Sequence, residues 1–297
     1  MGSCDSCNSG NSGNSPECGG CSTEGGQTDI SKANLSDDEK VKINMQRIAH
    51  KILVLSGKGG VGKSTVAVNL ATALALQGRR VGLLDVDFHG PSIPTLLHLE
   101  GKRPEATENG LLPITIEGGM KVMSIGFLLQ RPDDAVIWRG PLKIGAIKQL
   151  LGDVAWGDLD YLVIDFPPGT GDEPLTVAQT IPEADGAVVV TTPQDVSTID
   201  VSKSVTFCRQ LNIPVLGVVE NMSGLICPHC SKLIDLFKQG GGEEMAKRMG
   251  VPFLGRIPLD PQIVQSSDEG RPFVYHHSNT EAAAAFQGIV EPLLDLR

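Results

Sequence analysis

The sequence lacks a long hydrophobic run. No stretch of its 297 residues approaches the roughly 18 consecutive apolar residues that a membrane-spanning helix needs. The N-terminus also lacks the basic segment and apolar segment that are typical of a secretory signal. We therefore expect a cytoplasmic protein without a transmembrane helix.

The chain is also short of positive charge. It has 25 Lys and Arg residues against 35 Asp and Glu residues, which gives a formal net charge of −10. Nucleic acids and anionic membranes carry negative charge, so both would be repelled by the average surface of this protein. We expect neither as a partner. The 40% of hydrophobic residues is enough for a globular protein with a full core.

The N-terminal region differs in composition from the rest. Residues 1–28 are almost entirely Gly, Ser, Asn and Cys, a composition that cannot build an apolar core. We expect a flexible tail that carries thiols. Residues 29–47 are polar with a weak helical pattern, and Ser36 is placed to cap a short helix. This segment is predicted to be a linker or a docking helix.

From residue 51 onward, short β-branched runs alternate with helical stretches. Continuous apolar runs indicate strands that are covered on both faces, so residues 48–297 are predicted to form one α/β domain with a doubly wound, mostly parallel sheet. The predicted strands are residues 51–56, 79–87, 121–127, 161–166, 186–193, 214–221 and 251–258. The predicted helices are residues 62–77, 140–152, 172–181, 195–211, 241–249 and 279–291.

A phosphate-binding motif follows the first predicted strand. Residues 56–65 are SGKGGVGKST, which matches the pattern G-x-x-x-x-G-K-[ST] between a strand and a helix. In such a P-loop the backbone N–H groups and the helix N-terminus bind phosphate oxygens, Lys63 neutralises their charge and Ser64 ligates Mg²⁺. We therefore expect ATP to contact Gly57, Lys58, Gly59, Gly60, Val61, Gly62, Lys63, Ser64 and Thr65.

Carboxylates follow two further predicted strands. Asp85 and Asp87 lie in LLDVDFHGPS, and Asp165 lies in VIDFPPGTGDE. Ligands of doubly wound sheets bind at the carboxyl ends of strands, where these residues are predicted to lie. Asp165 follows an apolar strand as a Mg²⁺-binding Walker B aspartate does, and the glycines behind it permit a nucleotide-dependent movement. Each aspartate, taken alone, is also compatible with a turn or a helix cap.

The loop has a second lysine. GKGGVGK, which contains Lys58, resembles the deviant Walker A motif of the MinD/ParA superfamily. The resemblance implies that Lys58 contacts nucleotide in the partner subunit of a dimer, that Asp87 orients the attacking water and that Asp85 supports the Mg²⁺ shell. It also implies that Asn221 recognises adenine, whose edge matches an amide. From the residues alone, a solvated lysine and a turn-forming asparagine remain open.

Cys227 and Cys230 form the pair CPHC. One pair supplies two thiolates, whereas zinc and iron–sulfur clusters usually take four ligands. The pair is compatible with half of a zinc site, with a redox-active pair, or with half of a cluster site shared by two subunits. Cys208 lies in a helical pattern and is expected in the core.

Four further cysteines lie in the N-terminal tail: Cys4, Cys7, Cys18 and Cys21. They form two CxxC pairs, and four thiolates are enough for a second cluster or a zinc ion within one chain. The alternative is that they are accessory or merely reactive thiols.

Five motifs in order give the sequence its most specific signal: GKGGVGKST, DVDFHGPSIP, IDFPPGTGDE, TTPQDVS and ENMSGLICPHC. Together they resemble the Mrp/ApbC family of iron–sulfur cluster carrier ATPases over roughly residues 40–297. The resemblance implies a homodimer, or a heterodimer with a paralogue, in which Cys227 and Cys230 of each subunit hold one bridging 4Fe–4S cluster. Some eukaryotic relatives carry an N-terminal cluster, but with a different cysteine spacing.

The same resemblance implies slow ATP hydrolysis with Lys58, Lys63 and Asp87 as catalytic residues. The protein would receive a cluster from a donor and transfer it to apo iron–sulfur proteins. A MinD/ParA-like positioning ATPase is the alternative, but it would need a basic amphipathic C-terminal helix or a basic surface. The C-terminal segment TEAAAAFQGIVEPLLDLR is acidic instead. A nitrogenase-reductase-like electron donor would have cluster ligands that are far apart in the sequence.

Overall fold

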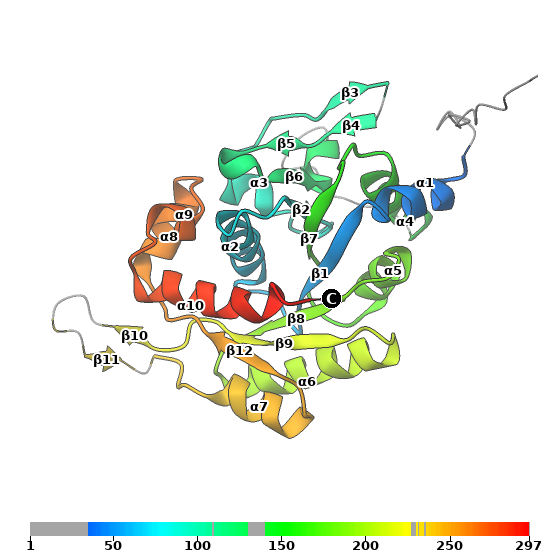
Figure 1. The fold of residues 1–297 in the computed structure, drawn as a ribbon. Helices are drawn as coiled ribbons and strands as arrows, with labels where there is room; N and C mark the ends of the chain where they lie inside the picture. Colours follow the sequence, from blue (N-terminus) through cyan, green and yellow to red (C-terminus); the bar gives the residue numbers. More distant parts are fainter. Residues whose placement is uncertain are drawn as a thin grey trace, which may run out of the picture. The chain divides into compact units, whose positions relative to one another are not determined.

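A parallel sheet built around the P-loop strand forms the centre of the fold (Figure 1). The computed structural model describes residues 35–108, 110–129, 140–226, 230, 232–234 and 236–296. Within these ranges, eight strands pair in the order β12-β9-β8-β1-β7-β2-β6-β5, and all of these pairs are parallel except β5 with β6. The strands are β1 (Ile48–Ser56), β2 (Val81–Asp85), β5 (Ile114–Thr115), β6 (Lys121–Ser124), β7 (Leu159–Asp165), β8 (Gly186–Thr191), β9 (Val215–Glu220) and β12 (Phe253–Arg256).

Helices cover both faces of the sheet, which confirms the predicted doubly wound α/β fold. The chain moves along the sheet in one direction from β1 to β2 and in the opposite direction from β7 to β8 and β9. With right-handed crossovers, α2 and α3 then lie on one face and α5, α6 and α7 on the other (Figure 1). The helices are α1 (Asp37–Met45), α2 (Lys63–Leu76), α3 (Ile93–Leu96), α4 (Gly140–Gly152), α5 (Asp172–Thr180), α6 (Asp195–Gln210), α7 (Gly241–Met249), α8 (Pro261–Asp268), α9 (Phe273–His276) and α10 (Glu281–Val290).

Helix α2 begins directly at the end of the P-loop. Gly62 has the left-handed backbone conformation, with φ of 79°, and Gly78 repeats it just after the helix with φ of 77°. Both ends therefore use the conformational freedom of glycine. Ten residues of the helix are buried, because it packs on β1, β2 and β7 and is covered by α10. This burial fixes the helix N-terminus next to the phosphate loop.

Helix α1 follows the predicted cap. The Ser36 hydroxyl accepts the Glu39 N–H, and the Glu39 carboxylate accepts the Ser36 N–H, so the two residues form a capping box. The helix packs against α4, where buried Asn44 donates from Nδ2 to the carbonyls of Leu151 at 2.6 Å and Val154 at 2.8 Å. Polar hydrogen bonds as well as apolar contacts therefore attach α1 to the rest of the fold.

The structure corrects the sequence prediction in the segment after β2. The strand expected over residues 121–127 ends at Ser124, and residues 125–128 form a 3₁₀ turn because the Ser124 hydroxyl accepts the Gly126 N–H. Three short antiparallel pairs in the described residues were not predicted, namely β3 (Glu105–Thr107) with β4 (Gly110–Leu112), β5 with β6, and β10 (Leu225–Ile226) with β11 (Leu233–Ile234). In the described part of the chain, none of the helices has the length and hydrophobicity required to cross a bilayer.

Candidate nucleotide and cysteine site

The phosphate loop forms an open cradle between β1 and α2. A Cβ atom placed on Gly59 or Gly60 would meet no atom within 4 Å, so both residues face free space. On the opposite side the loop is tightly packed: a Cβ on Gly57 would lie 2.4 Å from the backbone of Asp200, and one on Gly62 would lie 2.3 Å from Nδ2 of Asn221. Only glycine fits at the two packed positions, and the open side leaves room for phosphate.

Lys63 lies at the centre of the carboxylates. Its ammonium is buried and donates to Oδ1 of Asp165 at 2.6 Å, while Oδ2 of Asp87 lies 3.8 Å away. It is also 3.4 Å from the Ser64 hydroxyl. The structure therefore brings together four residues that the sequence predicted from three separate motifs. The lysine that is expected to bind phosphate pairs here with the Walker B aspartate.

Asp85 is buried behind the loop. β2 and β7 are paired in register so that Asp85 lies beside Asp165, and both side chains are completely buried. The carboxylate of Asp85 accepts the Ser124 hydroxyl at 2.9 Å and the Asp87 N–H at 3.1 Å. Burial, and secondly the charge of Asp165, raises the pKa of Asp85 to about 8.

Asp87 shapes the loop that follows β2. Its Oδ1 atom accepts the N–H groups of His89 and Gly90, each at 3.2 Å, which is an Asx turn. The carboxylate borders the same cavity as the P-loop. Burial raises the pKa of Asp87, and the ammonium of Lys63 opposes this shift. The residue is thus held at the phosphate cavity by its own turn.

The carboxylate arrangement fits a magnesium–nucleotide complex. Oδ2 of Asp165 is buried and has no hydrogen-bond partner, and burial raises the pKa of Asp165 despite the neighbouring Lys63. A cation would satisfy both conditions. Among the described residues, no three His, Cys, Asp or Glu side chains are arranged to hold a metal ion. Mg²⁺ typically uses one or two carboxylates together with substrate phosphates, so this arrangement requires nucleotide oxygens as further ligands.

The phosphate cavity has a volume of about 280 Å³ and is bordered by Lys58, Ser64 and Thr65 of the P-loop side and by Pro168 from the turn after β7. That turn is attached to β1, because the Gly169 N–H donates to the Ser56 carbonyl at 2.8 Å. The segment after β7, whose glycines are expected to permit a nucleotide-dependent movement, and the segment after β2 therefore both reach this cavity.

Asn221 holds the P-loop from behind. Its Nδ2 group donates to the Val61 carbonyl at 2.9 Å, and its side chain is buried. It follows directly after β9, which ends at Glu220, one residue earlier than the predicted strand over residues 214–221. The adenine contact that the resemblance assigned to Asn221 stays a prediction, whereas its hydrogen bond to the loop is a structural fact.

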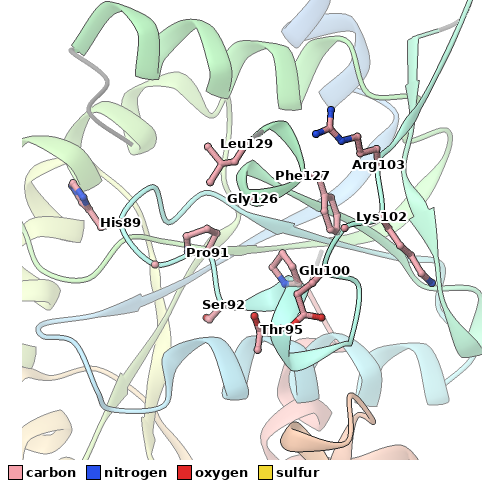
Figure 2. A pocket seen from close by; sticks show the side chains of 13 residues that line it. His89, Pro91, Ser92, Thr95, Glu100, Lys102, Arg103, Gly126, Phe127 and Leu129 are labelled. Carbon is pink, nitrogen blue, oxygen red and sulfur yellow. The ribbon is translucent and has the colours of Figure 1, made fainter. Parts of the chain in front are cut away.

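A second cavity of about 370 Å³ borders the loop after β2. It shares Gly90 and Ser92 with the phosphate cavity. Figure 2 shows the side chains of Pro91, Phe127 and Leu129 around it. The two cavities are thus separated by one loop.

The two cysteines among the described residues differ in exposure. Cys208 is completely buried, as predicted, and burial raises the pKa of its thiol to about 12. Cys230 is exposed with a free thiol, in the segment between the paired strands β10 and β11. Cys4, Cys7, Cys18, Cys21 and Cys227 lie outside the described residues.

Sequence reasoning missed three polar residues near the site. Ser124 donates to Asp85. Glu173 of α5 pairs with His89 at 2.9 Å and with Lys143 of α4 at 3.1 Å, and so connects the loop after β2 to two helices. Glu220 is a fully buried carboxylate at the end of β9. A carboxylate directly after the apolar run VLGVV was the only available signal for Glu220.

This fold and site define a P-loop NTPase of the MinD/ParA structural class. The structure is similar to the cell-division ATPase MinD of Pyrococcus furiosus, with a TM-score of 0.63 and 25% identity, covering 84% of this chain and 100% of that one. It is also similar to a nucleotide-binding protein of Archaeoglobus fulgidus in complex with ADP, with a TM-score of 0.72 and 45% identity, covering 80% and 93% of the two chains.

Sequence comparison identifies the family. Residues 47–294 match the model of the NUBPL iron-transfer P-loop NTPases within the ParA group. The iron–sulfur cluster carrier protein of Methanocaldococcus jannaschii is 52% identical over 279 residues, 94% of this chain and 96% of that protein. The cytosolic Fe–S cluster assembly factor NUBP2 of Rattus norvegicus is 51% identical, covering 84% and 94%. The chain belongs to the Mrp/NUBPL family of iron–sulfur cluster carrier P-loop NTPases, as the five motifs predicted.

Proposed function

We propose that this protein is an ATP-binding carrier that holds a 4Fe–4S cluster between two copies of the chain and transfers it to apo iron–sulfur proteins. The observation that carries the proposal is the exposed thiol of Cys230, which lies in the segment between the paired strands β10 and β11. This segment follows the strand end that holds the P-loop. An exposed thiol at this place suits a cluster that must be received and released.

The second half of the cluster site would come from a second subunit. A 4Fe–4S cluster takes four thiolates, and Cys227 with Cys230 supplies two. Two-fold symmetry brings the same pair of a second copy to the same axis, so that four thiolates arise from two chains. The partner is a second copy or a closely related paralogue, and the further partners are cluster donors and apoproteins.

ATP hydrolysis would use the residues around Lys63. Lys63 would leave Asp165 to neutralise the phosphates, and Asp87 would orient the attacking water from its fixed turn. Lys58 of the second subunit would add positive charge. Ser64, Asp85 and Asp165 would hold the Mg²⁺ shell, and the ion would neutralise the charge that develops on the phosphate oxygens. Asn221 would contact the adenine from its position at the end of β9.

The four cysteines of the N-terminal tail would form a separate site. Four thiolates from Cys4, Cys7, Cys18 and Cys21 are enough for a second cluster or for zinc. We propose that the carrier acts in the cytoplasm, the compartment named for the rat relative. A reducing compartment keeps such thiols available for metal binding.

Anaerobic reconstitution with iron and sulfide tests the cluster proposal. In a full-length chain with Cys4, Cys7, Cys18 and Cys21 all changed to Ala, we expect about four iron atoms per two chains and the absorption of a 4Fe–4S cluster. Adding Cys227→Ala and Cys230→Ala should remove both the iron and the absorption. Iron content is measured by chemical assay, and the oligomeric state by sedimentation.

Cys208 provides the matched control. Cys208→Ala removes a thiol from the same domain, but this thiol is completely buried. Iron binding should therefore be unchanged in that variant. An unchanged iron content after loss of Cys227 and Cys230 would refute the bridging cluster.

A further inference from the structure

Glu220 is a buried carboxylate between the nucleotide site and residues 224–239, which contain Cys227 and Cys230 and are called the cysteine segment below. It is the last residue of β9 and is completely inaccessible to solvent. Burying an ionised carboxylate costs several kcal/mol unless hydrogen bonds and opposite charge compensate it. A carboxylate at this position therefore needs hydrogen-bond donors and a positive charge around it, which a neutral residue would not need.

The hydrogen bonds of Glu220 reach both ends of the cysteine segment. Oε1 accepts the Ser223 hydroxyl at 2.6 Å and the Gly240 N–H at 2.9 Å, and Oε2 accepts the Gly242 N–H at 2.6 Å. Ser223 comes just before β10, and Gly240 comes after β11. One carboxylate thus contacts the chain on both sides of the cysteine segment: Ser223, called the entry stem, and residues 240–242, called the exit stem. Arg256 lies 3.5 Å from Oε1 and supplies opposite charge.

The exit stem is packed too tightly to shift freely. Gly240 precedes α7 with φ of 87°, a conformation that favours glycine. A Cβ on Gly242 would lie 2.9 Å from the Thr191 methyl group and 3.0 Å from Oε2 of Glu220. The start of α7 is therefore in direct contact with the carboxylate. A displacement of Glu220 has to move this stem.

The neighbouring residue holds the P-loop. Asn221 donates to the Val61 carbonyl at 2.9 Å, and its backbone N–H donates to the Thr191 carbonyl at 2.7 Å. Glu220 and Asn221 are consecutive residues. One of them contacts the two stems and the other contacts the phosphate loop, so the two contacts are joined by a single peptide bond. The Glu220 carbonyl accepts the Ile257 N–H at 2.8 Å, which fixes this backbone further.

We propose that Glu220 is a positioning residue that clamps both stems of the cysteine segment and, through Asn221, couples the nucleotide state of the P-loop to Cys227 and Cys230. The inference rests on the proposed function in that these two cysteines hold the cluster. Nucleotide bound in the P-loop would shift Val61 and, through their hydrogen bond, Asn221. The adjoining Glu220 would then shift as well, and with it its hydrogen-bond partners Ser223 and Gly240. Such a coupling is expected to change thiol reactivity about fivefold or more between nucleotide states.

Thiol labelling of cluster-free, full-length protein tests the coupling. The alkylation rate of Cys230 is measured by peptide mass spectrometry with a non-hydrolysable ATP analogue and with ADP, and the ratio of the two rates is compared. In Glu220→Gln, an amide donor replaces one acceptor oxygen and the negative charge is lost. We expect its rate ratio to approach one, while its ATP affinity stays within about twofold, well below the coupling range.

Two further variants separate coupling from general destabilisation. Ser223→Ala removes only the hydrogen bond at the entry stem and should reduce the rate ratio, which keeps the test valid if Glu220→Gln does not fold. Thr280→Val removes the side-chain cap of α10, where Thr280 accepts the Ala283 N–H, and should leave the ratio unchanged.

Three outcomes would overturn the proposal. These are a wild-type ratio near one, a wild-type ratio retained in both Glu220→Gln and Ser223→Ala, or a loss of the ratio that accompanies an equal loss of ATP affinity. Failure of the proposed function would be visible separately. Reconstitution would then show no cluster at Cys227 and Cys230, whereas the labelling ratio is measured without a cluster.

Discussion

At the level of single residues, the nucleotide site holds more negative than positive charge. Asp85, Asp87 and Asp165 lie around one buried ammonium, that of Lys63. Burial raises the pKa of all three carboxyls, because an ionised group in the interior loses its hydration. Such a site is costly for the empty protein and favourable for a bound cation. The charge needed for nucleotide binding is therefore a stability cost in its absence.

Asp85 gives this cost a pH dependence. Its pKa in the folded protein is about 8, above the usual value of 3.8, so between these values the folded state holds a proton that the unfolded state has released. The contribution of Asp85 to the free energy of unfolding of nucleotide-free protein should therefore fall as pH rises from about 4 to about 8, by at most about 1.4 kcal/mol per pH unit. Urea denaturation across this range measures the slope. Asp85→Asn should flatten it, and an equal slope in the variant would contradict the assignment.

At the level of elements, strand ends and helix starts bring the chemistry together. The sequence predicted the P-loop and both aspartate loops because apolar runs mark buried strands and because parallel strands end at one edge. The helices over residues 140–152 and 241–249 have the predicted limits. The strand after residue 121 was too long in the prediction, because β-branched and aromatic residues continue past Ser124 into the 3₁₀ turn.

The contacts of Glu220 and Ser124 were not predictable in the same way. Glu220 accepts from Gly240, which is 20 residues away in the sequence, and Ser124 donates to Asp85, which is 39 residues away. No local sequence pattern indicates such pairs. Pattern reasoning places a residue on a strand or loop, whereas a buried hydrogen bond depends on sheet order and helix position. The missed residues are therefore those whose function depends on tertiary contacts.

Helix α1 provides a prediction at this scale. Asn44→Ala should remove the hydrogen bonds from Nδ2 of Asn44 to the carbonyls of Leu151 and Val154. The Val154 carbonyl still accepts the Trp156 N–H at 2.9 Å, so the Leu151 carbonyl is the one that loses its side-chain donor without this replacement. An unsatisfied buried acceptor costs about 1–3 kcal/mol and a lost hydrogen bond about 1 kcal/mol, so we expect the free energy of unfolding to drop by about 2–4 kcal/mol. Denaturant unfolding measures the change.

Ser36→Ala is the comparison for Asn44→Ala. It removes the cap of the same helix without touching α4 and should cost about 1 kcal/mol. If Asn44→Ala lowered the free energy of unfolding by no more than Ser36→Ala does, the hydrogen bonds of Asn44 would not be what attaches this helix to the fold.

At the level of the whole molecule, one P-loop edge serves two proposed partners, the nucleotide and a second subunit. Ile199 is 61% exposed next to Asp200, whose backbone packs on Gly57. Lys58 borders the phosphate cavity at the same edge. An exposed apolar residue beside the nucleotide is suited to a contact that forms between two subunits.

Two lysines distinguish binding from assembly. Lys63→Ala should abolish ATP binding, because its ammonium lies inside the carboxylate cluster of the same chain. Lys58→Ala should bind ATP nearly as wild type but lose ATP-dependent dimers and about 100-fold or more in kcat, as expected for loss of one charge-stabilising group. Calorimetry with ATP, sedimentation and phosphate release measure the three properties. Hydrolysis at the wild-type rate by Lys58→Ala would contradict action across the dimer.

The sheet order also determines when this protein can become active during its synthesis. β1, which carries the P-loop, lies between β7 and β8, and β8 ends at Thr191. On the ribosome, the phosphate loop is made early but has no neighbouring strand on either side until more than half of the chain has been translated, because such long-range pairs form late. Cys4, Cys7, Cys18 and Cys21 precede the P-loop in the sequence and are therefore made well before the nucleotide site exists. Any metal they bind at that stage would be bound by a nascent chain that has no means of responding to ATP.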